Sequence, residues 1–357
     1  MVNYSIHTLE LQSHLSHEDF YELKQSLQEQ HPSIEQKTIP LKDDFYAISY
    51  IHRRLPYYGI NNITLTAIKF ETHTLRYLLY LYLNPFQALH MCRRPDSHII
   101  EPEKINTAME LIFHNLTSIL KPNIIHTLTL NRLDFCANLL FPFQIQAEEY
   151  LSLLKRGIPK KVLSEVKHFN ASQHRYTAYK DSILLKCNSY SFQIYPKYQQ
   201  MVQRYGKTPD DALGMLRFEL RASKPKLEQL AKKYNIISPK IDFLQFLSHA
   251  PYITKKEIPK IVSKMVGNRN FYRYQKIKSK IMDSDYKDSD KDLMLRIIYY
   301  FSRHSSSENF LEEFHLQNKD WQKIIKKFDK LKCSPIPIPR TYKFPVYPGV
   351  SIWDVSF

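Results

Sequence analysis

Three segments of the chain alternate apolar and polar residues in the way that a half-buried β-strand requires. They span residues 132–138, 191–197 and 216–221. Their polar faces carry Arg132, Asp134 and Asn138, then Gln193, Tyr195 and Lys197, then Arg217, Glu219 and Arg221. If the three strands pair, these side chains share one surface.

The chain up to about residue 225 mixes strand and helix periods. Helices are predicted over 17–30, 103–120 and 147–156, and strands over 45–53, 63–70 and 75–83, the last ending at Asn84-Pro85. Residues 174–197 resemble a hairpin with a turn near Lys180-Asp181 and an interruption at Cys187-Asn188. Strands separated by helices, with some hairpins, predict an α+β domain over 1–225, built on a largely antiparallel sheet with flanking helices.

Beyond residue 225 the strand pattern stops and helical periods take over. They run over 226–234, 242–249, 258–282, 291–304 and 308–332, before a proline-punctuated tail at 335–348. We therefore expect a smaller all-helical domain over 226–357. Its last two helices, joined through Ser305, Ser306 and Ser307, resemble a helix-turn-helix pair that would place one helix in a DNA major groove.

The charge of the chain favours a nucleic acid as its partner. The chain has 51 basic and 35 acidic residues among 357, a net charge of +16, and such an excess favours a polyanionic partner. A basic protein from an A·T-rich genome is the alternative. Residues 255–280 hold nine Lys or Arg and one acid, with Phe271, Tyr272 and Tyr274 interleaved. As one helix they form either a phosphate-following stripe or a solvated face with core aromatics. The candidate DNA contacts here are Lys264, Arg269, Arg273 and Lys276.

Composition also excludes several classes of function. The four cysteines lie far apart without a CxxC pair, so a disulfide framework or a zinc site is not expected. The six glycines are too dispersed for a phosphate-cradling loop or a dinucleotide fingerprint. The N-terminal residues lack the features of a signal peptide, and the longest apolar run, 77–83, is too short to cross a bilayer. We expect a cytoplasmic protein with no membrane partner.

Tyr195 is the candidate nucleophile. Alternation places Tyr190 on the apolar face of its strand and Tyr195 on the polar face with Lys197. Pro196 cannot donate to a ladder, which predicts an edge or a bulge that exposes Tyr195. A phenol, with a pKa of about 10, is a weak nucleophile at neutral pH, and a nearby cation would stabilise the phenolate or the phosphate. The alternative is that Tyr195, one of 25 tyrosines, only covers a sheet edge.

Asp134 and Glu219 lie inside strands, where acidic residues are depleted, and each is flanked by arginine. They form either a structural ion-pair ladder or a site for a hard cation such as Mg²⁺ or Mn²⁺. A metal there would polarise a scissile phosphate and stabilise the departing 3′ oxygen. Asn138 and His126 are weaker candidates for the same site.

A family resemblance follows from the order of these motifs. Arg132-Leu133-Asp134, then Ile194-Tyr195-Pro196-Lys197, then Arg217-Phe218-Glu219 resembles the plasmid rolling-circle replication initiators of the Rep_trans type, which are related to relaxases of integrative elements and to some phage initiators. The strand ending at Asn84-Pro85 resembles a family strand that closes in the same way. The resemblance spans roughly 70–225 and is diffuse across the C-terminal part. The chain departs from the family at Gln199 and Gln200, near positions where members often carry an acid, and it lacks a second acid near Asn138. It also has no His-hydrophobe-His pair.

The resemblance implies a metal-dependent DNA nickase and ligase. Tyr195 would attack a phosphodiester in a single-stranded or extruded segment of a replication origin, forming a covalent 5′-phosphotyrosine and freeing a 3′-hydroxyl for a host polymerase. Asp134 and Glu219 would hold Mg²⁺ or Mn²⁺, while Lys197 and Arg132, Arg217 and Arg221 would grip phosphate. A host helicase and a second copy of the chain are further candidate partners. The alternatives are a conjugative relaxase with the same chemistry, a non-catalytic DNA-binding protein on the same fold, and an RNA-binding or RNA-processing protein.

Overall fold

The computed structural model describes residues 2–30, 34–41, 45–55, 58–71, 73–91, 98–158, 163–170, 175–178, 181–206, 210–304 and 309–353. Its strands are β1 (Val2–Leu15), β2 (Ile34–Pro40), β3 (Phe45–Leu55), β4 (Ile60–Phe70), β5 (His73–Leu83), β6 (Thr129–Leu140), β7 (Ser164–Glu165), β8 (Lys167–Asn170), β9 (Arg175–Ala178), β10 (Ile183–Lys186), β11 (Tyr190–Pro196), β12 (Met215–Ser223), β13 (Phe271–Tyr272) and β14 (Val346–Tyr347).

The helices are α1 (His17–Gln30), α2 (Pro85–His90), α3 (Ile105–Leu116), α4 (Pro122–His126), α5 (Gln144–Lys155), α6 (Lys197–Tyr205), α7 (Lys224–Tyr234), α8 (Phe243–Ser248), α9 (Ala250–Val266), α10 (Tyr274–Met282), α11 (Asp288–Arg303), α12 (Phe310–Glu313) and α13 (Asn318–Lys330). Short 3₁₀ turns are η2 (Pro102–Lys104), η4 (Asp210–Ala212) and η5 (Val350–Ile352). Within the described ranges, no helix is both long enough and apolar enough to cross a membrane.

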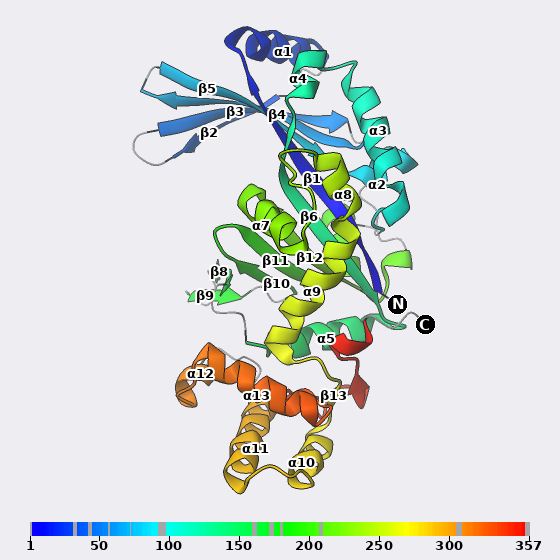
Figure 1. Cartoon of the computed structure of the whole chain (residues 1–357), viewed down its shortest axis with the longest axis vertical. Coiled ribbons are helices and arrows are strands. Elements are labelled where there is room, and N and C mark those ends of the chain that lie inside the picture. Colours follow the sequence, from blue (N-terminus) through cyan, green and yellow to red (C-terminus); the bar gives the residue numbers. More distant parts are fainter. Residues whose placement is uncertain are drawn as a thin grey trace. The chain divides into compact units, whose positions relative to one another are not determined.

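The fold is α+β, as predicted. Ten strands form one large, largely antiparallel sheet in the order β2-β3-β4-β5-β1-β6-β12-β11-β10-β7. Helices flank this sheet, and the C-terminal region is helical (Figure 1). Two small sheets, β8-β9 and β13-β14, lie outside it.

The chain forms two compact units whose boundaries interleave along the sequence. The first comprises Met1–Asn3, Ala137–Leu220 and Lys255–Phe357, and the second comprises Tyr4–Cys136 and Arg221–Thr254. Strands β6 and β12 contribute residues to both units. The division predicted near residue 225 does not coincide with these boundaries, because residues 221–254 pack with the second unit and those from 255 onward with the first.

Strand β1 is an interior strand of the sheet that the sequence reading did not predict. It pairs with β5 so that Leu9 opposes Leu83 and Leu11 opposes Leu81, and all four side chains are fully buried. The chain then turns into α1, where the Ser16 hydroxyl accepts from the Asp19 amide and satisfies an otherwise orphaned helix donor. Helix α1 confirms the prediction over 17–30, and it buries Phe20, Leu23 and Leu27.

In the first unit, the proline-punctuated tail is packed rather than extended away from the protein. The buried Glu149 carboxylate on α5 accepts from the Lys343 amide and from the Tyr347 hydroxyl. Further along, Trp353 packs edge-on against Phe218 of β12, with ring centroids 4.8 Å apart. The tail therefore fastens onto a helix and onto the strand that carries Glu219.

Three predicted elements are wrong in detail. The hairpin over 174–197 is divided: β9 pairs with β8, whereas β10 pairs with β11 through a turn in which the Cys187 amide donates to the Tyr190 carbonyl. The predicted turn residue Lys180 lies outside the described residues.

The predicted helices over 258–282 and 308–332 are each divided as well. Helix α9 ends where Gly267 adopts a φ of 85°, a left-handed value that glycine takes without strain. Strand β13 follows, so residues 255–280 do not form one continuous helix. The last predicted helix consists of α12 and α13, and the serines at 305–307 lie outside the described residues.

Candidate active site

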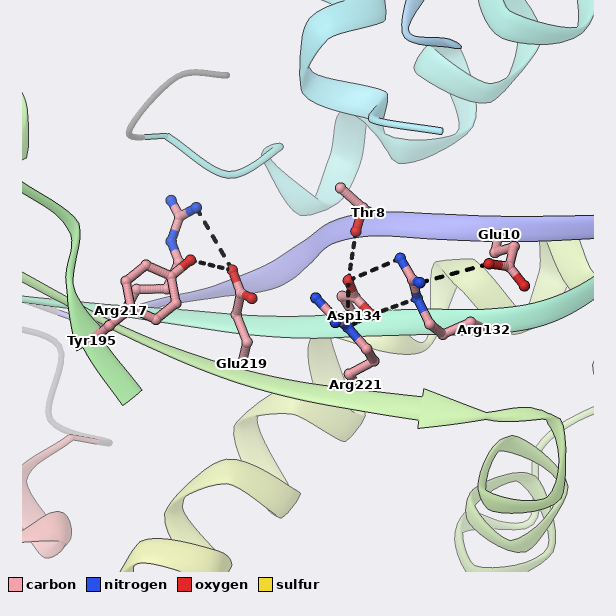
Figure 2. Close-up of polar contacts among 8 residues, drawn as sticks. All are labelled: Thr8, Glu10, Arg132, Asp134, Tyr195, Arg217, Glu219 and Arg221. Carbon is pink, nitrogen blue, oxygen red and sulfur yellow. Dashed lines mark hydrogen bonds and ion pairs between the residues drawn. The ribbon is translucent and has the colours of Figure 1, made fainter. Parts of the chain in front are cut away.

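The three strands singled out by their alternation are neighbours. In the large sheet β6 lies next to β12 and β12 next to β11, so their polar faces meet as the pattern predicted. Cross-strand contacts on these faces join the side chains into two clusters, which Figure 2 draws.

The first cluster centres on the Glu219 carboxylate, to which Tyr195 and Arg217 both point (Figure 2). The Tyr195 hydroxyl donates to Glu219 Oε1 at 2.6 Å, and Arg217 Nη1 lies 4.0 Å from the same oxygen. Arg217 Nε donates to Asn138 Oδ1 at 2.9 Å, which holds the guanidinium in place. A hydrogen bond from a phenol to a carboxylate in such surroundings is short and strong, and the carboxylate is placed to accept the phenolic proton.

This first cluster is buried. Tyr195 and Glu219 are each 5% exposed and Arg217 is 0% exposed. The prediction that Tyr195 would be accessible at an edge or a bulge is wrong, because β11 lies between β12 and β10 in the sheet. Pro196 is instead the last residue of the strand and the N-cap of α6.

Lys197 does not continue the strand face of Tyr195. It is the first residue of α6, it is buried, and its Nζ donates to Gln200 Oε1 at 2.9 Å. Gln199, the neighbouring glutamine, donates to Glu148 on α5 at 2.8 Å. Gln199 and Gln200, the two positions at which the chain departs from the Rep_trans pattern, therefore help to hold α6 in place.

The second cluster surrounds Asp134, which is 1% exposed (Figure 2). Its carboxylate accepts from Arg132 Nε at 3.1 Å, from Arg221 Nε at 3.3 Å and from the Thr8 hydroxyl at 2.6 Å. The Arg221 side chain is 48% exposed and that of Arg132 21% exposed. Asp134 thus pairs with two arginines, of which Arg221 is the more exposed and the better placed to meet an anionic group.

Two residues of this second cluster come from β1 and were missed by the sequence reading. Thr8 binds Asp134, and Glu10 accepts from Asn131 and lies 3.6 Å from Arg132 Nη1. Burial and a hydrogen bond to Glu10 raise the pKa of the Tyr82 phenol well above its ordinary value. The alternation of Leu9 and Leu11 with polar neighbours is the sequence pattern that could have predicted β1. The pattern is weakened because Ile6, at an even position, is also buried, whereas Leu9 and Leu11 stand at odd positions.

The two predicted metal ligands, Asp134 and Glu219, each lie against arginine in this arrangement. Carboxylate and amide oxygens are the donors that Mg²⁺ prefers, and Glu219 and Asn138 supply such oxygens. Both, however, lie against Arg217, and a guanidinium at that distance competes with a cation. Asp134 is likewise committed to two arginines. Over the described ranges, no three His, Cys, Asp or Glu residues lie close enough to hold an ion together.

The remaining predicted DNA contacts differ in what their side chains do. Lys276 on α10 and Arg269 after α9 are exposed, and Lys264 on α9 is half-buried. The Arg273 guanidinium donates to the Pro339 and Tyr342 carbonyls, so it anchors the C-terminal tail. His126, the weaker metal candidate, is exposed at the end of α4.

Comparisons with known proteins add little to this geometry. No protein-family model matches the chain, and no curated protein matches it. Among solved structures it is similar to a rolling circle replication initiator protein from Geobacillus stearothermophilus, with 11% identity and a TM-score of 0.29. That likeness covers 68% of this chain and 80% of the other. At such values it decides neither fold nor chemistry.

Proposed function

We propose that the protein initiates rolling-circle replication by cutting and rejoining one DNA strand through Tyr195. The observation that carries the proposal is the buried 2.6 Å hydrogen bond from the Tyr195 hydroxyl to Glu219. It is supported by the order of the three strand motifs, which resembles that of the Rep_trans initiators. A carboxylate is a proton acceptor as well as a hydrogen-bond acceptor, so it can serve both a buried tyrosine and a nucleophilic one.

In the proposed reaction, Tyr195 Oη forms a bond to phosphorus while the bond from phosphorus to the 3′ oxygen breaks. The phenolic proton passes to Glu219, and the departing 3′ oxygen takes a proton from solvent to become a 3′-hydroxyl. Arg217, beside the same carboxylate, stabilises negative charge as the proton moves. The reverse transfer rejoins the strand.

Tyr195 is 5% exposed, so the reaction requires a movement that uncovers its hydroxyl. A phosphodiester reaches the phenol only when this movement has occurred, because the attacking and accepting atoms must come within about 3–3.5 Å. Opening on DNA binding would restrict cleavage to the bound state.

Arg132 and Arg221 are proposed to hold a DNA phosphate in the second unit. Asp134 pairs with both guanidinium groups, and the Arg221 side chain is 48% exposed, so that it can meet a phosphate oxygen at the surface. Asp134 then acts as a positioning residue for two arginines.

Dependence on Mg²⁺ or Mn²⁺ stays a prediction from the resemblance. A cation would stabilise charge on the 3′ oxygen, but the two proposed ligands, Asp134 and Glu219, face arginines in this structure. None of the steps above is therefore assigned to a metal.

A non-catalytic DNA-binding protein on the same fold is the second candidate. The burial of Tyr195 and of Arg217 favours it, because both side chains then serve the stability of the sheet. A conjugative relaxase would use the same Tyr195 chemistry on a different DNA site.

The test is a nicking assay on supercoiled plasmids bearing candidate origins from the same replicon, with Mg²⁺, with Mn²⁺ and with EDTA. The wild type should yield open circles and a covalent adduct of DNA with protein, and Tyr195→Phe should yield neither. Tyr190→Phe is the matched control, because Tyr190 lies on the same strand and is only half-buried. Equal nicking by wild type and Tyr195→Phe, or none by wild type on any origin, would refute the proposal.

A further inference from the structure

Helix α13 carries a stripe of four exposed lysines. They are Lys319, Lys323, Lys326 and Lys330, which follow one another at intervals of four, three and four residues. At 1.5 Å per residue and 3.6 residues per turn, they lie on one side of the helix over about 16 Å. The opposite side is buried through Trp321, Ile324, Ile325 and Phe328. We call these four residues the lysine stripe.

The two aspartates of α13, Asp320 and Asp329, accept hydrogen bonds from neighbouring residues. Asp329 accepts from the Asn268 amide and side chain, next to the end of α9. Asp320 accepts from the Gln317 amide in a capping box at the start of the helix. Asp320 also pairs with Lys323 at 3.3 Å, but that lysine is 71% exposed and such a pair is weak. The lysine stripe therefore keeps a local excess of positive charge.

The helix that bears the stripe is firmly held. Trp321 packs against Phe301 of α11 and Phe310 of α12, with ring centroids 5.9 and 5.3 Å away. Lys327, on the flank of α13, pairs with Asp290 of α11 at 2.5 Å. The four exposed lysines are thus presented on a fixed backbone, which lowers the entropic cost of binding a regular array of charges.

We propose that the lysine stripe binds the phosphate backbone of duplex DNA. Each strand of a duplex presents a regular row of phosphates, so a stripe of about 16 Å lies over more than one of them. Proteins that hold a single strand stack bases on aromatic side chains, and the described residues of α13 include no exposed aromatic. Lysines on a straight helix suit a duplex backbone instead.

Acidic residues near the lysine stripe limit where the DNA backbone can lie. Exposed Glu312 and Glu313 on α12 repel phosphate, so the DNA backbone follows α13 itself and not the short helix before it. The contact carries no base readout, since a lysine ammonium on a phosphate reports no sequence. It deepens the proposed function by assigning a duplex-holding surface, and it differs from the contacts predicted at Lys264, Arg269, Arg273 and Lys276.

The experiment measures binding of the full-length protein to a labelled mixed-sequence duplex of about 30 base pairs over a range of NaCl concentrations. One variant replaces the lysine stripe: Lys319→Gln, Lys323→Gln, Lys326→Gln and Lys330→Gln. The matched control removes the same charge from exposed lysines elsewhere: Lys37→Gln, Lys104→Gln, Lys232→Gln and Lys240→Gln. Thermal melting checks that both fold, as expected for substitutions of exposed residues.

The stripe variant should bind at least tenfold more weakly near 0.1 M salt, and the slope of log K against log salt should fall by about 3 to 4. The control should change the slope by less than about 1. Equal slopes for the two variants would overturn the proposal, and so would a stripe variant that loses affinity only for a single-stranded oligonucleotide. Binding is measured without cleavage, so a failure of the Tyr195 chemistry is read separately in the nicking assay.

Discussion

Replacing Glu219 by Gln tests the chemistry of the first cluster most directly. Gln keeps the shape of the side chain and an oxygen that accepts from the Tyr195 hydroxyl, but it removes the negative charge. It therefore separates a carboxylate that takes a proton from a residue that only orients the phenol.

The expected losses follow from the geometry. At 2.6 Å, with both side chains 5% exposed, the bond from Tyr195 to Glu219 is charge-assisted, and its neutral counterpart is worth about 1 kcal/mol less. Arg217 loses its countercharge at 4.0 Å but keeps its bond to Asn138. Together these changes lower the free energy of unfolding by roughly 2–4 kcal/mol. Losing the proton acceptor slows cleavage by roughly 10²–10⁴.

The assay is single-turnover cleavage of a single-stranded origin oligonucleotide below the melting temperature of the variant, repeated over a range of pH. In Glu219→Gln the rate should recover as pH rises, because hydroxide then removes the phenolic proton. Tyr195→Phe should show no recovery. Cleavage by Glu219→Gln within about threefold of the wild type at neutral pH would refute a proton-accepting role, since a general base contributes at least about 10²-fold.

Two further predictions concern stability. Asp134→Asn removes the countercharge of Arg132 and Arg221 and should lower the free energy of unfolding in urea by about 2–3 kcal/mol, whereas Glu22→Gln, which is 51% exposed and pairs with the equally exposed Lys121, should cost under about 0.5 kcal/mol. Equal costs would contradict the assigned role of Asp134. Burial raises the pKa of the Cys333 thiol to about 12, so the neutral thiol stabilises the fold fully below the unfolded pKa of about 8.5. That stability is lost as pH rises toward 12, at about 1.4 kcal/mol per pH unit, and Cys333→Ala should lack this slope.

Much of the fold follows from local pattern, as two elements illustrate. Phe20, Leu23 and Leu27 recur at helical spacing, and the structure buries all three on α1. Alternation marked the strand that carries Asp134, and β6 is that strand. These periods are properties of consecutive residues, so the sequence predicts them without knowledge of the packing.

Other elements depend on partners far along the chain. Nothing local distinguishes a strand at 175–178 that pairs with β10 from one that pairs with β8. Pro196 is compatible with an edge strand and with a strand that ends inside a sheet, and only the neighbouring β12 and β10 decide between them. The role of β1 cannot be predicted locally for the same reason, because Thr8 joins the second cluster only through its hydrogen bond to Asp134.

Local sequence pattern was enough to predict the α+β class and the three polar strand faces, because alternation and charge can be read one residue at a time. The choice of Tyr195 over Tyr190 stays a prediction, and the structure buries Tyr195 more deeply than Tyr190. What those faces do depends on contacts between distant parts of the chain. The tertiary structure buried Tyr195 against Glu219 and gave Asp134 two arginines in place of a second carboxylate. It also presented the lysines of α13 on one exposed face. The partner of a side chain, and hence its chemistry, is set by strands and helices brought together from distant parts of the chain.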